Sequence, residues 1–117
     1  MKNDISYMKE MIYFCNQAKL VMRQAEQYGV NMNDELIIGS LAMQLGHIGE
    51  QLDSGKMSKE LQKRYSHIDW PNIKGLRIFL FHEYAQRNPK LIYKVYENEI
   101  ANDKLQKQIE AIIALES

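Results

Sequence analysis

The polar side chains of Arg77, His82 and Tyr84 lie close together in a stretch that is otherwise mostly apolar. An arginine can hold two oxygens of an anionic group at once, a histidine can transfer protons near neutral pH, and a tyrosine adds a hydroxyl group. Structural roles are the alternative. The arginine can pair with a carboxylate such as Glu83 or Glu50, and the histidine can be a hydrogen-bonded core or interface residue.

The spacing of these residues limits how one helix can present them. Arg77 and Tyr84 are seven positions apart. At about 100° per residue they lie on nearly the same side of a straight helix. His82 follows Arg77 by five positions, so it points about 140° away. One straight helix therefore cannot direct all three side chains at one small ligand. Either the helix loosens near His82, or the site is assembled from two copies of the chain.

Apolar residues recur at three- and four-residue steps along most of the chain, which predicts amphipathic helices. Gly29 is a plausible helix stop, and Asn33 or Asp34 and Ser58 are candidate N-caps. Pro71 is tolerated in a first helical turn, so a helix is expected to start near Trp70. We expect helices at about residues 4–28, 34–52, 70–84, 89–99 and 102–115, with a short helical turn at 58–65. No stretch alternates strictly enough to predict a strand. The sequence therefore predicts one all-α domain over residues 1–117, an antiparallel bundle of about four to five helices.

Three glycines, Gly39, Gly46 and Gly49, lie inside the second expected helix. Each weakens a helix by about 1 kcal/mol relative to alanine. We interpret Gly46 and Gly49 as positions where another helix packs closely, and a helix break is the alternative.

Composition and charge exclude several classes of protein. Fifteen basic and fifteen acidic residues among 117 give zero formal charge, so any contact with nucleic acid has to be local. Cys15 is the only cysteine, which excludes an intramolecular disulfide and favours a buried side chain over a reactive thiol. The charged N-terminus lacks a signal-peptide core, and no apolar run approaches the roughly 20 residues that span a bilayer. We expect a soluble, cytoplasmic protein with no membrane association.

Metal and nucleotide sites are not expected. His47 and His67 are 20 residues apart and lack a cysteine or carboxylate pattern with zinc spacing. No glycine-rich phosphate loop occurs, so the chain is not itself a nucleotidyltransferase. We therefore predict neither a metal nor a cofactor.

The motif around Arg77 resembles that of a known family. The order Arg77, four residues, His82, one residue, Tyr84 is similar to the motif of HepT-like proteins of the HEPN superfamily. Two further features also resemble that family: Trp70, which precedes the motif arginine, and Ile48-Gly49-Glu50 on the second expected helix. The likeness extends over almost the whole chain.

The resemblance implies the toxin of a bacterial toxin–antitoxin pair, a metal-independent endoribonuclease that acts on RNA as a homodimer. Its partner would be a minimal nucleotidyltransferase antitoxin, which silences the toxin by attaching AMP to the motif tyrosine. Carried over by position, Arg77 would bind the scissile phosphate, His82 would act as general acid or base, and Tyr84 would accept the nucleotide. Apart from the resemblance, Glu50 could pair with Arg77 across the second and third helices and hold its guanidinium in place, or it could be a solvated glutamate on the helix face.

One residue departs from the family pattern. The position after the motif arginine is commonly polar in HepT-like proteins, and here it is Ile78. A polar group there could orient the arginine or the substrate. An alternative function therefore stays open, that of a catalytically silent subunit that binds a nucleotidyltransferase partner. The intact Arg77, His82 and Tyr84 favour the ribonuclease.

Overall fold

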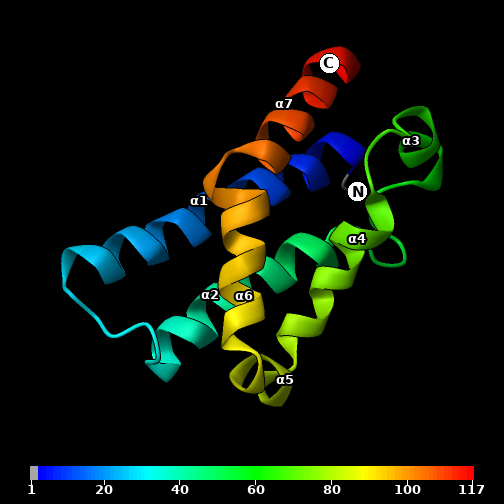
Figure 1. Ribbon diagram of the computed structural model, residues 1–117. Coiled ribbons are helices and arrows are strands. Elements are labelled where there is room, and N and C mark those ends of the chain that lie inside the picture. The colour runs from blue at the N-terminus through cyan, green and yellow to red at the C-terminus, as the bar shows by residue number, and fades with distance from the viewer. Residues whose placement is uncertain (1–2) are drawn as a thin grey trace.

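A computed structural model of the chain describes residues 3–117, which form helices joined by short connections (Figure 1). In chain order the elements are α1 (Asp4–Gln27), α2 (Glu35–Glu50), α3 (Lys59–Arg64), α4 (Trp70–Lys74), the 3₁₀ segment η1 (Gly75–Leu80), α5 (His82–Arg87), α6 (Pro89–Val95), the π-helical segment η2 (Tyr96–Ala101) and α7 (Lys104–Glu116). Residues 3–117 contain no strand, so the predicted all-α class is confirmed.

The long helices pack around one core. α2 and α7 both pack against α1, and η1 packs against α2 (Figure 1). The largest fully buried side chains come from α1, α2, α3, α6, η2 and α7: Met8, Met11, Leu41, Leu45, Ile48, Leu61, Ile92, Ile100, Leu105, Ile109 and Ile112. Each contributes about 1.5–3 kcal/mol through removal of apolar surface from water. Cys15 is buried among them, and this burial raises the pKa of its thiol to about 12, which confirms the prediction of a buried side chain.

Local sequence signals set most helix starts. The side chains of Asp34, Ser58 and Asp69 accept hydrogen bonds from backbone N–H groups in the first turns of α2, α3 and α4. Such caps typically stabilise a helix by about 1 kcal/mol. Gly29 has a φ of 63°, a conformation that favours glycine, directly after α1. These predicted boundaries are confirmed to within two residues at α1 and α2.

α2 and η1 approach each other closely at two glycines. A Cβ atom on Gly49 would lie 2.8 Å from the backbone nitrogen of Arg77 and 2.8 Å from the carbonyl oxygen of Ile73. A Cβ atom on Gly46 would lie 2.6 Å from the side chain of Leu80. The prediction that another helix packs against Gly46 and Gly49 is confirmed.

The expected continuous helix at 70–84 is wrong. α4 ends at Lys74, the chain tightens into η1, and Phe81 adopts an extended conformation with ψ 109° before α5 begins at His82. Gly75 directly follows α4, but residues 76–84 contain neither glycine nor proline, so no local breaker explains the break at Phe81. We attribute it to tertiary packing, because Leu80 is seated over Gly46 and Phe79 is buried.

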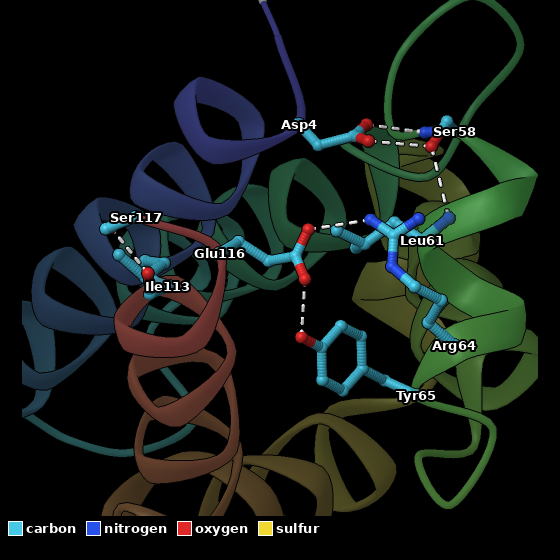
Figure 2. Close-up of polar contacts among 8 residues, drawn as sticks. All are labelled: Asp4, Ser58, Leu61, Arg64, Tyr65, Ile113, Glu116 and Ser117. Carbon is cyan, nitrogen blue, oxygen red and sulfur yellow. Dashed lines mark hydrogen bonds and ion pairs between the residues drawn. The ribbon is translucent and has the colours of Figure 1, made fainter.

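Side chains at both ends of the chain hold α3 in place (Figure 2). The Asp4 carboxylate accepts hydrogen bonds from the backbone N–H and the hydroxyl of Ser58, at 2.7 and 2.6 Å. Glu116 accepts hydrogen bonds from the Tyr65 hydroxyl and from Arg64 Nη2, each at 2.6 Å. These two bonds lower the pKa of Glu116, and the shared hydrogen bond raises the pKa of Tyr65.

No helix within residues 3–117 is long and apolar enough to span a membrane.

Candidate active site

Arg77 is held by two carboxylates. Its Nε atom donates a hydrogen bond to Glu50 Oε2 at 3.2 Å, and its Nη2 atom lies 3.1 Å from Asp53 Oδ2. The second carboxylate oxygen of Glu50 lies 3.6 Å from Lys56 Nζ. The Arg77 side chain remains 39% exposed, so it is fixed and still reachable from solvent. Of the two roles considered for Glu50, the structure shows the pairing with Arg77 and not a solvated glutamate.

Asp53 was not among the residues singled out from the sequence. It lies three positions after Glu50, in the turn that follows α2. Because positions three apart share one side of a helical turn, this spacing is the signal by which Asp53 could have been found. The sequence could not show that η1 packs against the end of α2, next to this turn.

His82 is the first residue of α5 and is exposed. Within residues 3–117 its imidazole makes no hydrogen bond or ion pair, so both ring nitrogens are available to a ligand. It lines an open hollow of about 480 Å³ together with Phe81, Glu83, Tyr84, Arg87 and Asn88. A histidine in this setting can accept or donate a proton directly to a bound group.

Tyr84 is half-buried in the same hollow. Its ring packs against Phe79, with ring centroids 6.1 Å apart. Among the described residues no hydrogen bond engages its hydroxyl group. A continuous helix would place Tyr84 on nearly the same side as Arg77. This prediction is wrong, because the chain is extended at Phe81.

Arg77 and His82 line different hollows. The hollow at Arg77 has a volume of about 500 Å³, and its other lining residues are Pro71, Lys74, Gly75, Ile78, Leu80 and Phe81. Phe81, 69% exposed, lines both hollows and stands between them. The chain does loosen before His82, as one of the two expected alternatives requires. The interruption nevertheless leaves the motif residues in two neighbouring hollows of one chain.

The surroundings of Arg77 are apolar on one side. Ile78 is 39% exposed in the same hollow and supplies no polar group beside the guanidinium. Leu80 and Phe81 continue this exposed apolar surface, and Met43 and Leu36 on α2 are exposed as well. Within residues 3–117 no group of three or more histidine, cysteine or acidic side chains could hold a metal ion.

Comparison with known proteins assigns the family. A family model described as "Ribonuclease HepT-like" matches residues 1–112, which include every element up to most of α7. The chain belongs to the HepT-like ribonuclease family. The curated protein "Putative RNase TTE0752" of Caldanaerobacter subterraneus subsp. tengcongensis is 29% identical to this chain over 85 residues, which are 73% of this chain and 72% of the relative. No solved structure matches the chain. RNA cleavage is thus the class of activity that the comparisons support.

Proposed function

We propose that the protein is the toxin of a bacterial toxin–antitoxin pair, a metal-independent endoribonuclease that is silenced when AMP is attached to Tyr84. The observation that carries the proposal is Arg77, a cation fixed by Glu50 and Asp53 yet open to solvent, in a chain that belongs to a ribonuclease family. A fixed guanidinium suits a phosphodiester because it can donate two hydrogen bonds to two oxygens.

RNA supplies its own nucleophile for this reaction. The 2′-hydroxyl attacks the adjacent phosphorus, the bond from phosphorus to the 5′-oxygen breaks, and a 2′,3′-cyclic phosphate and a 5′-hydroxyl result. His82 accepts the proton of the 2′-hydroxyl as general base. The leaving oxygen receives a proton from an acid, which is either water or a protonated histidine. Arg77 stabilises the charge that develops on the phosphate oxygens.

The complete site requires a second copy of the chain. Phe81 separates the hollow of Arg77 from that of His82, and Ile78, Leu80 and Phe81 expose an apolar surface at this point. Such contiguous exposed apolar surface marks an interaction site. A homodimer through this surface covers the apolar side chains and faces Arg77 of one copy toward the motif residues of the other.

Nucleotidylation explains how the toxin is kept inactive. The Tyr84 hydroxyl attacks the α-phosphorus of ATP held by a minimal nucleotidyltransferase antitoxin, the tyrosyl O–P bond forms, and pyrophosphate leaves. Tyr84 lines the same hollow as His82, so an attached AMP occupies the space that RNA needs at the general base. Its phosphodiester also adds a negative charge that repels the RNA backbone.

A catalytically silent subunit that binds the nucleotidyltransferase is the second candidate. The observation that favours it is Ile78, an exposed apolar side chain where a polar group beside the arginine is expected.

RNA cleavage in EDTA by protein confirmed to lack AMP separates the two functions. For the ribonuclease, Arg77→Ala and His82→Ala should each lower the rate by roughly 10²–10⁴-fold. His67→Ala is the matched control, because His67 is exposed in the turn after α3 and should leave the rate unchanged. Ile78→Asn should raise the rate. Equal inactivity of the wild type and His82→Ala, with no rescue by Ile78→Asn, would assign the silent subunit.

A further inference from the structure

The two carboxylates that hold Arg77 approach one edge of its guanidinium. Glu50 accepts from Nε, and Asp53 is paired with Nη2 at 3.1 Å. A guanidinium has five N–H donors in a fixed planar arrangement. The Nη1 side has no partner among residues 3–117, so it is the side that remains available to a phosphate.

Among the described residues, the Asp53 side chain makes no ion pair or hydrogen bond other than its contact with Arg77. The backbone of Asp53 is held separately, since its N–H donates to the Glu50 carbonyl and its own carbonyl accepts from the Lys56 N–H, each at 3.0 Å. These backbone bonds survive substitution of the side chain. The carboxylate is therefore dispensable for the turn and specific to Arg77.

Charge around Arg77 is balanced. Arg77 and Lys56 contribute two positive charges, and Glu50 and Asp53 contribute two negative charges within 3.1–3.6 Å of them. These four charges cancel, and Lys74, which lines the same hollow and has no ion pair among residues 3–117, leaves one positive charge for an incoming phosphate. Asp53 fixes the direction of the guanidinium while it weakens the attraction of the site for an anion.

We propose that Asp53 is a positioning residue of the ribonuclease, which holds the Nη2 edge of Arg77 so that the Nη1 side faces the scissile phosphate. This role rests on the proposed function, because it assumes that Arg77 binds RNA. It adds to that function a distinction between the residue that orients the arginine, Asp53, and the positive charge that attracts the RNA.

Two substitutions of Asp53 separate the contact of its oxygen with Arg77 Nη2 from its charge. Asp53→Asn keeps an oxygen near Nη2 and removes the charge, so kcat should stay within about 3-fold while KM for RNA falls. Asp53→Ala removes both, so kcat should fall by about 10-fold while KM does not rise. Glu110→Ala is the control of equal charge change, because Glu110 is exposed on α7 and has no ion pair among the described residues. It should change neither parameter.

Nuclear magnetic resonance tests the clamp without any activity. The Arg77 Nη2–H signal, assigned from its loss in Arg77→Lys, should be sharp in the wild type and in Asp53→Asn. In Asp53→Ala it should broaden or exchange faster, while the melting temperature stays within about 3 °C of the wild type. An unchanged Arg77 signal in Asp53→Ala would overturn the proposal, and so would a changed signal with an unchanged kcat. A wild type that does not cleave RNA would instead refute the proposed function, with the NMR comparison still deciding whether Asp53 holds Arg77.

Discussion

Replacement of Gly49 by alanine tests the packing that positions Arg77. The added Cβ atom would lie 2.8–2.9 Å from three backbone atoms: the nitrogen of Arg77 and the carbonyl oxygens of Ile73 and Lys74. Backbone atoms cannot rotate away as a flexible side chain can, so η1 has to move relative to α2. Overpacking of this kind typically costs about 1–3 kcal/mol.

A smaller effect opposes this cost. Alanine is favoured over glycine in a helix interior by about 1 kcal/mol, but Gly49 is the second-to-last residue of α2, where the gain is smaller. The net loss should be about 1–2 kcal/mol. For a domain of this size, it corresponds to a fall in melting temperature of roughly 4–10 °C.

Gly39→Ala is the matched control in the same helix. A Cβ atom on Gly39 would meet only Gln86 Nε2, at 3.5 Å, which is an ordinary contact with a flexible side chain. This variant should gain up to about 1 kcal/mol from helix propensity and melt at a higher temperature than the wild type. Thermal denaturation followed by far-UV circular dichroism measures both variants. If Gly49→Ala melted as high as Gly39→Ala, the close approach of α2 and η1 would be refuted as the reason for the glycine.

Three further predictions address the modified residue, the dimer and the effect of pH. Mass spectrometry after incubation with the cognate nucleotidyltransferase and ATP should find AMP on Tyr84 and none on Tyr93. The Tyr93 hydroxyl already donates a 2.6 Å hydrogen bond to a backbone carbonyl. AMP on Tyr93 with Tyr84 unmodified would reject the assignment. Phe81→Glu should convert a dimer into a monomer in light scattering, because it puts a charge on the apolar surface; a wild-type monomer at micromolar concentration would contradict the dimer. The lowered pKa of Glu116 means that this carboxylate stabilises the fold above its ordinary pKa of 4.5 and loses that contribution as the pH falls through the lower folded value. The stability difference between the wild type and Glu116→Gln should therefore be present at pH 7 and shrink in acid, and a difference that does not depend on pH would count against the bond to Tyr65.

Features with a local cause were predictable from the sequence. The N-caps Asp34 and Ser58 and the stop at Gly29 act within a few residues, so their pattern is visible in the sequence itself. The close contacts at Gly46 and Gly49 were also predictable, since glycine inside a helix is costly unless something packs against it.

Features set by contacts between distant elements were not predictable. The motif helix breaks at Phe81 without a glycine or proline there, and we attribute the break to the packing of Leu80 against Gly46. Asp53 reaches Arg77 only because the packing of η1 against α2 brings the turn after α2 next to η1. The roles proposed for Arg77, His82 and Tyr84 come from the family motif. A continuous helix would have put Arg77 and Tyr84 on one side, whereas the structure places them in separate hollows.

The attachment of α3 to both ends of the chain has a consequence for the order of folding. Its side-chain bonds join residues 51–54 positions apart, from Asp4 to Ser58 and from Arg64 and Tyr65 to Glu116. Contacts between distant residues require closure of long loops, which costs chain entropy before any contact forms. α1 and α2 are neighbours in the chain and can pair early. The α3 segment gains its partners only after α1 and α7 have docked, so it should be the last part of the domain to become ordered and the first to open.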